Sequence, residues 1–223
     1  MINIRTFKSL QEQAYDYLKT QILEDAFQDG TIYSETKLAE EIGISRTPLR
    51  NALQRLNQEG FIDIFPSKGF TLRVFSEKDV IELFQIRTAI EGFSASMLAR
   101  DCNTAPARAT IVALDEILVK MAQIIETTYD IKSFYEIDQK FHIIMVDYVE
   151  NNEFSTLFRT YLYRMKKLAL NSLRSENRLN TTLKEHTEIL NAIKAGSVTK
   201  VYDAILTHMQ SSTVINLKRY TNF

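Results

Sequence analysis

The chain has 223 residues, of which 45% are hydrophobic and 25% are charged, and its formal net charge is −1. This length is sufficient for two small domains, while the near-neutral charge excludes a generally basic nucleic-acid-binding protein. A single cysteine excludes an intramolecular disulfide, and no apolar run approaches the ~20 residues that a membrane span needs. Without a signal-peptide core at the N-terminus, these features predict a cytoplasmic protein with no membrane partner.

The first third of the chain has the element order of a winged helix-turn-helix. Helical spacing predicts a helix within residues 9–27 and a short one between Ser34 and Gly43. A third helix is expected over 46–59, since Pro48 is tolerated only in a first turn. Residues 61–65 and 70–74 then alternate around a Pro-Ser-Lys-Gly turn, which predicts a β-hairpin wing.

From Ser76 onward the pattern predicts helices alone, joined by short connections that favour an antiparallel bundle. The chain has only six glycines and three prolines, which is consistent with long helices. We therefore expect a mostly α protein with an N-terminal winged helix-turn-helix (1–75) and a C-terminal all-α antiparallel helical bundle (76–223). The expected helices of the bundle span about 77–101, 106–128, 131–149, 152–173, 178–195 and 198–219.

The third predicted helix carries the candidate DNA contacts. The second helix of a helix-turn-helix enters the major groove with its N-terminal residues. Arg46 and Arg50 lie four residues apart on one face, and arginine can hold guanine bidentately. Such arginines can also be an ordinary solvated face, but the order of elements favours DNA contact. The candidate contacts, including the hairpin tip, are Ser45, Arg46, Thr47, Arg50, Lys68 and Gly69.

The segment "KLAEEIGISRTPLRNALQRLNQEGFIDIFPSKGFTLRVF" resembles the DNA-binding signature of GntR-type transcription regulators. The resemblance implies that Arg46 and Arg50 read bases, that Ser45 and Thr47 touch the backbone, and that the Lys68–Gly69 wing tip reaches the adjacent groove. Two departures stand out. Thr36 occupies a position where several members carry a DNA-contacting Arg or Lys, and Asn51 stands where Glu is usual. A palindromic double-stranded operator and a homodimer are expected, because two recognition helices must meet two half-sites.

All three histidines of the chain fall in the second predicted domain. Asp138 precedes His142 by four residues, so both side chains share one helix face. His186 and His208 lie equally far from the break at residue 197, which places them level in an antiparallel helix pair. Three imidazoles and a carboxylate suit Zn²⁺ or another first-row divalent ion. Spacing alone leaves a metal site and three ordinary core histidines both open, and Glu185 is a weak ligand candidate.

Residues 76–223 resemble the helical effector domain, of FCD type, in the FadR subgroup of these regulators. The resemblance lies in "IRTAIEGFSASMLA", "IDQKFH", "EHTEILNAIKAG" and "AILTHM". It implies a divalent metal, zinc first with nickel or manganese as alternatives. A small carboxylate metabolite would complete the site, with Arg87 pairing with it or with Glu91 four residues on. The implied ligands are Asp138, His142, His186 and His208.

Three functions compete for this sequence. The first is a DNA-binding repressor whose metal-bearing domain senses the metabolite and alters operator affinity. The second is a metal-dependent hydrolase-like enzyme using the Asp/His₃ centre, and the third is a ligand-free helical dimer module. The winged domain, which an enzyme would not need, favours the repressor, so we expect no catalytic activity.

Overall fold

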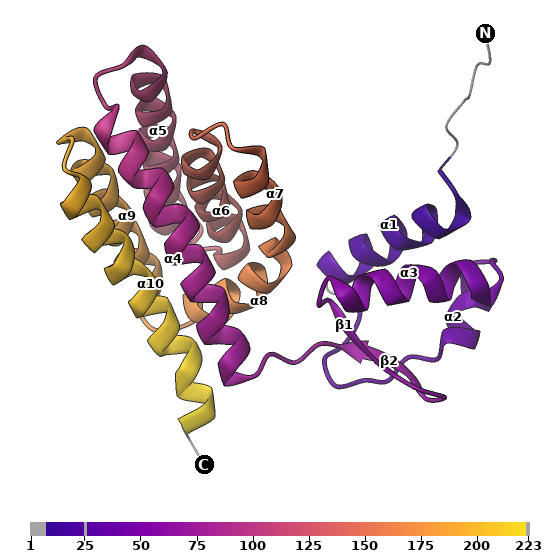
Figure 1. The fold of residues 1–223 in the computed structure, drawn as a ribbon. Coiled ribbons are helices and arrows are strands. Elements are labelled where there is room, and N and C mark those ends of the chain that lie inside the picture. The colour runs from indigo at the N-terminus through magenta and orange to yellow at the C-terminus, as the bar shows by residue number, and fades with distance from the viewer. Residues whose placement is uncertain (1–7, 25, 222–223) are drawn as a thin grey trace, which may run out of the picture. The chain divides into compact units, whose positions relative to one another are not determined.

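The computed structural model describes residues 8–24 and 26–221, in two compact units divided between Phe75 and Ser76 (Figure 1). Asp25, inside the first expected helix, and the extreme ends of the two expected domains lie outside the described residues. Across these residues the chain is mostly helical with one two-stranded sheet, so the expected fold class is confirmed. None of the helices within the described ranges is both long and apolar enough to cross a membrane.

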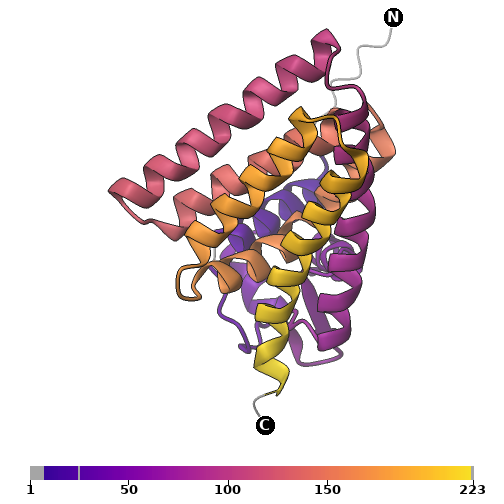
Figure 2. The same cartoon turned by 90° about the vertical axis from the view of Figure 1, so that its left-hand side faces the viewer.

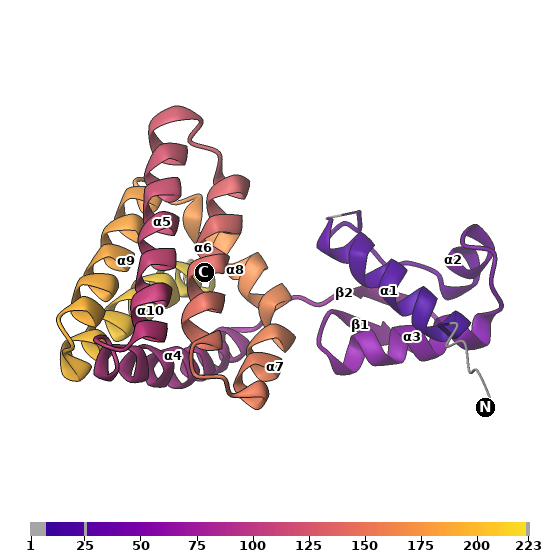
Figure 3. The ribbon, with the colours of Figure 1, turned by 90° about the horizontal axis from the view of Figure 1, so that it is seen from above.

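The first unit is built on three helices, α1 (Leu10–Leu23), α2 (Glu35–Glu41) and α3 (Arg46–Gln58). Ser9 caps α1 in a capping box with Glu12, and the Ser34 side chain caps α2. α3 packs against both other helices, as Figure 3 shows from above. Its inward face is fully buried and carries the core of this unit, formed by Leu49, Ala52, Leu53 and Leu56.

The wing consists of β1 (Ile62–Phe65) and β2 (Gly69–Leu72), paired antiparallel from Ile62↔Leu72 to Phe65↔Gly69. The strands are shorter than expected and shifted, and this corrects the placement of Gly69. It begins β2 and is buried, with φ +122°, and a Cβ there would lie 2.0 Å from the Tyr33 carbonyl oxygen. Glycine is therefore required by the close approach of Tyr33, whereas Lys68 is exposed in the turn.

The second unit contains only helices in its described residues, and Figure 2 shows their side-by-side packing. The long α10 packs along α4 and α9, while α5 packs against α6 and α9. Ser76 opens α4 with a capping box, and Thr104 and Asp130 cap α5 and α6. The helices are α4 (Glu77–Arg100), α5 (Ala105–Thr127), α6 (Ile131–Asp147), α7 (Asn152–Thr160), α8 (Leu162–Leu173), α9 (Arg178–Lys194) and α10 (Val198–Thr221).

The single helix expected over 152–173 is wrong, because the chain forms α7 and α8 with a break at Tyr161. The break carries neither glycine nor proline, so nothing local marks it. It follows from packing. α7 lies against α6 and α4, whereas α8 turns to pack on α6 and α10, and this buries Phe158 on one side of the break and Tyr163 on the other.

Candidate metal centre and DNA-binding surface

The predicted DNA contacts of the first unit form an exposed group at the start of α3. Ser45 is the N-cap residue, yet its hydroxyl makes no cap hydrogen bond within the described chain. Lys68 is exposed on the wing turn. The α3 helix has no acidic residue in its first turn, so the helix dipole and the arginines act together on an anion. The exposed members of this set are Thr36, Ser45, Arg46, Thr47, Arg50 and Lys68.

Two contacts within the first unit bear on this surface. The Nε of Arg50 lies 3.7 Å from Oε2 of Glu35 on α2, and the Arg50 side chain remains 61% exposed. This long, solvated pair leaves the guanidinium available to another acceptor. The Asn51 amide donates to Gln11 on α1 at 3.1 Å, which accounts for an amide at that position.

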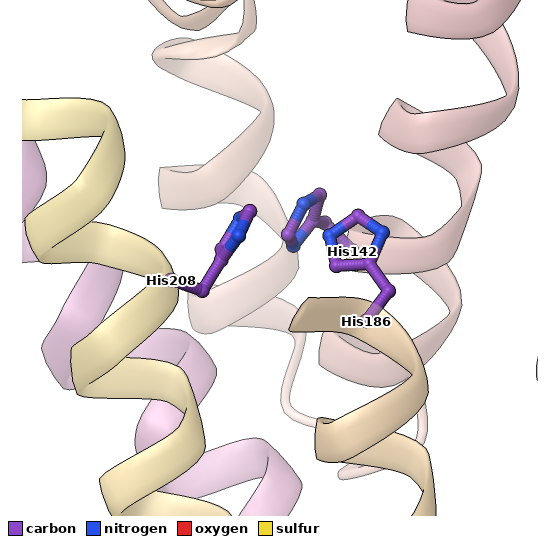
Figure 4. Close-up of side chains that lie close together, drawn as sticks. All are labelled: His142, His186 and His208. Atoms are coloured by element: carbon purple, nitrogen blue, oxygen red, sulfur yellow. The ribbon is translucent and has the colours of Figure 1, made fainter. Parts of the chain in front are cut away.

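The three histidines converge in the core of the second unit from three different helices. His142 lies on α6, His186 on α9 and His208 on α10, and all are buried. Figure 4 shows their rings turned toward one another. Their ring centroids are 4.7–5.3 Å apart, and one ring nitrogen from each can be chosen so that all lie within 4.8 Å of one another. Such a group can bind one cation.

Asp138 adds a carboxylate to this cluster from one turn before His142. Its Oδ1 lies 3.9 Å from Nε2 of His142 and 3.6 Å from Nε2 of His186. Among the described residues, these three atoms are buried without a hydrogen-bond partner, as is Nδ1 of His186. Each unsatisfied buried polar group costs about 1–3 kcal/mol. A divalent cation would satisfy Asp138 Oδ1 and one nitrogen of each ring together, so the donor set fits the expected metal.

Burial determines the protonation of two of the rings. Desolvation, together with the neighbouring rings of His208 and His142, lowers the pKa of His186 well below its ordinary value. Desolvation also lowers the pKa of His208, although Glu185 acts in the opposite direction. Both rings are therefore neutral near pH 7, which is the form that binds a metal.

Sequence reasoning missed a second layer of carboxylates behind the histidines. Oε2 of Glu91 on α4 lies 2.6 Å from Nδ1 of His142, and Oε2 of Glu185 lies 2.7 Å from Nδ1 of His208. Sequence spacing marks Glu185 only as a weak ligand candidate, and it relates Glu91 only to Arg87, four residues earlier. No local pattern connects Glu91 to a histidine 51 residues away.

Arg87 is buried, and its Nε donates to Glu91 at 2.7 Å. This is the ion pair that the sequence offers as the alternative to effector binding. The same side chain lines two small cavities beside Asp138. One of them brings in a second arginine, Arg178, that the sequence did not suggest. Ser172 and Thr182 line it too, and their hydroxyls and Nε of Arg178 are buried without partners in the described chain.

Comparison with known proteins finds a family match for each of the two units. The bacterial regulatory proteins, gntR family, match residues 10–72, and the FCD domain matches residues 82–211. The chain is 24% identical over 88% of its length to the uncharacterized HTH-type transcriptional regulator YdhC of Bacillus subtilis, covering 86% of that protein. It is also 24% identical to the HTH-type transcriptional repressor RspR of Escherichia coli, over 90% of this chain and 86% of RspR.

A solved structure shares the fold. That of E. coli McbR/YncC has a TM-score of 0.72 at 23% identity, covering 96% of this chain and 100% of that one. The relatives are transcriptional regulators, which decides against the hydrolase-like alternative. The chain therefore belongs to the GntR family of bacterial regulatory proteins, and it is a DNA-binding transcription regulator with an FCD domain rather than an enzyme.

Proposed function

We propose that this regulator, of the FadR subgroup, is a homodimeric repressor whose affinity for a palindromic operator depends on a small carboxylate metabolite. The metabolite binds in the second unit beside a divalent metal, zinc first with nickel or manganese as alternatives. Asp138, His142, His186 and His208 hold the metal. The base-reading residues are Arg46 and Arg50, Ser45 and Thr47 contact the DNA backbone, and Lys68 on the wing turn reaches the adjacent groove.

A single observation carries the metal assignment. Three imidazoles and a carboxylate meet in the buried core of the second unit, and Asp138 Oδ1, His142 Nε2 and His186 Nε2 lack any hydrogen-bond partner in the described chain. Ordinary core histidines are hydrogen-bonded when buried. A helical module without a ligand would leave these buried polar atoms unsatisfied, at a cost in folding free energy that nothing would offset. This argues against the ligand-free alternative.

The cavities beside the cluster support the effector class. A metal held by these residues would supply a Lewis-acidic position for a carboxylate oxygen. Arg87 and Arg178 line the same space, and the hydroxyls of Ser172 and Thr182 have no hydrogen-bond partner among the described residues. A small carboxylate, with or without hydroxyl groups, matches this lining. The anion would share Arg87 with Glu91, so binding perturbs α4, the helix that directly follows the DNA-binding unit.

A homodimer is part of the proposal because operator half-sites are read by two recognition helices. One surface of the second unit suits a second copy. A groove between α4 and α10 is lined only by uncharged side chains, and Ile81 and Tyr202 on its walls are exposed. Ala89 lines this groove, so Ala89→Glu would place a charge in it. Sedimentation analysis of the wild type and of this variant tests whether the groove is the dimer interface. A monomeric wild type would contradict it.

Metal content tests the proposed function directly. Purified wild type should retain close to one divalent ion per chain by inductively coupled plasma mass spectrometry. His142→Ala should lose most of it, because one of the buried ligands is gone. Glu136→Ala, which removes an exposed carboxylate from the same helix, is the control and should keep the metal. Unchanged metal content in His142→Ala would sink the ligand assignment.

The effector is tested with a panel of small carboxylates. Each is titrated into the metal-loaded protein by calorimetry, and operator affinity is then measured with and without the acid that binds. A ligand moves a conformational equilibrium only by its differential affinity for the two states. Equal operator affinity with and without a saturating acid would show that metabolite binding and DNA binding are uncoupled.

A further inference from the structure

Two histidines of the metal centre share a second contact that the ligand assignment leaves unused. Nδ1 of His142 lies 2.6 Å from Glu91, and Nδ1 of His208 lies 2.7 Å from Glu185. Behind each carboxylate stands an arginine. Arg87 donates through Nε to Oε1 of Glu91 at 2.7 Å, and Arg178 donates through two nitrogens to both oxygens of Glu185 at 2.8 and 2.9 Å.

The chemistry of the arginine determines what each carboxylate can do. A guanidinium only donates hydrogen bonds, so the glutamate beside it must accept. Arg87 forms a 2.7 Å ion pair with Glu91, and Arg178 forms a bidentate ion pair with Glu185, so each glutamate lies ionised beside its guanidinium. Both side chains are therefore acceptors at neutral pH.

An acceptor at Nδ1 dictates which nitrogen of a neutral imidazole carries the proton. We infer that Glu91 and Glu185 are positioning residues, which hold His142 and His208 as Nδ1–H tautomers with the Nε2 lone pair directed into the metal centre. The inference rests on the proposed metal site for its purpose. Carboxylates behind metal-ligating histidines generally orient the ring and raise its basicity.

The surroundings of the rings agree with this assignment. Nε2 of His142 is the nitrogen that lies near Asp138 and has no partner in the described residues. The third histidine is held differently. His186 stacks on Phe141 with ring centroids 4.4 Å apart and an interplanar angle of 9°, and both of its nitrogens lack partners among the described residues. The neighbouring carboxylates thus fix the tautomer and orientation of His142 and His208, whereas ring stacking orients His186.

Replacing Glu91 by glutamine gives a sharp test, because the amide has one acceptor and one donor side. The carbonyl oxygen must face the Arg87 Nε–H, since placing the amide NH₂ there would oppose two donors next to a buried cation. The NH₂ group then points at Nδ1 of His142 and requires a lone pair there. Glu91→Gln should therefore convert His142 to the Nε2–H tautomer, in which the metal-facing nitrogen is blocked. Glu82→Gln, exposed on the same helix, is the matched control.

The tautomers can be read in metal-free protein by long-range ¹H–¹⁵N correlation of labelled histidine. The measurement is made about two pH units above the ordinary histidine pKa of about 6.5. With only three histidines in the chain, each ring is assigned by single substitution. Wild type and Glu82→Gln should show Nδ1–H at His142 and His208. An Nε2–H tautomer at His142 in wild type, or an unaltered ring in folded Glu91→Gln, would overturn the inference. If Glu91→Gln does not fold, the wild-type tautomers and those of Glu185→Gln decide.

Zinc affinity, measured by competition with a chromophoric chelator, supplies the second readout. Glu91→Gln and Glu185→Gln should each bind zinc roughly 10–100-fold more weakly than wild type, and Glu82→Gln should equal it. If wild type binds zinc and the two glutamine variants bind it equally well, the positioning role is wrong but the metal site stands. Wild type that binds no metal ion would remove the proposed function, while the tautomer spectra would still judge the role of the two glutamates.

Discussion

At the scale of single residues, the DNA-binding surface depends on a few exposed side chains around the start of α3. Arg50 is the most informative of them. Its side chain is 61% exposed, and its Nε lies 3.7 Å from Oε2 of Glu35, a long and solvated ion pair that leaves the guanidinium available to DNA. Arg46 precedes it by one turn on the same exposed face.

Arg50→Ala should weaken operator binding by about 1–3 kcal/mol if the guanidinium holds a base edge. The loss should be largest on operators with guanine at the contacted position and should be measured by fluorescence anisotropy at fixed salt. Arg174→Ala, which removes an exposed arginine from the second unit, controls for the change in net charge. Retention of full affinity in Arg50→Ala would count against α3 as the reading helix.

The ionised Glu59 side chain contributes stability to the first unit that is lost at acid pH. Burial acts to raise the pKa of Glu59, but hydrogen bonds from Tyr15 and Lys19 and an ion pair with Arg55 lower it below 4.5. A depressed pKa in the folded state gives stability that is present at neutral pH and is lost as pH falls through the folded pKa.

Urea unfolding of the wild type should therefore show a decline in stability below about pH 4.3 that is smaller in Glu59→Gln. The difference should be about 1 kcal/mol at most, since the Glu59 carboxylate is partly solvated and screened. Glu40→Gln, exposed on α2, is the control. An identical acid decline in both proteins would mean that other carboxylates dominate.

At the scale of elements, α3 connects recognition with the core. Its outward face carries the arginines, and its inward leucines have no solvent exposure. Helical periodicity separates the exposed and buried side chains of α3 onto opposite faces. The effect of a substitution on one face can therefore be compared with that of a substitution on the other.

Leu53→Ala should destabilise the first unit by about 2–5 kcal/mol, because it removes a fully buried side chain and leaves a cavity. Gln54→Ala, at the adjacent exposed position of the same helix, should change stability by less than about 0.5 kcal/mol. Both are measured by denaturant unfolding. Equal effects of the two substitutions would contradict the orientation of α3.

At the scale of the whole molecule, the two units have separate cores, so a ligand of one should stabilise that unit. Zinc at about 100 times its Kd should stabilise the second unit by about 2.7 kcal/mol, which corresponds to a Tm increase of roughly 5–10 °C. Differential scanning calorimetry with and without chelator measures the shift. His142→Ala should show almost none. An equal shift in that variant would place the stabilising zinc elsewhere.

Local patterns were sufficient for much of the fold. Ser34 and Ser76 are helix caps that could be expected because their hydroxyls satisfy backbone amides a few residues away. Asp138 and His142 share a helix face for the same short-range reason. By contrast, the break at Tyr161 and the shifted start of β2 at Gly69 were not predictable from local spacing. They arise where a helix must turn between two neighbours and where Tyr33 approaches the strand.

The sequence by itself thus determined the helical content, the winged helix-turn-helix and the candidate ligands, because backbone capping and side-chain periodicity act over a few residues. Only the tertiary structure decided that three histidines from α6, α9 and α10 meet, that Glu91 stands behind His142, and that Arg178 joins Arg87 around one cavity. The physical reason is that these contacts depend on the rotation and depth of each helix. Those are set by the packing of the complete core, in which every buried side chain constrains its neighbours.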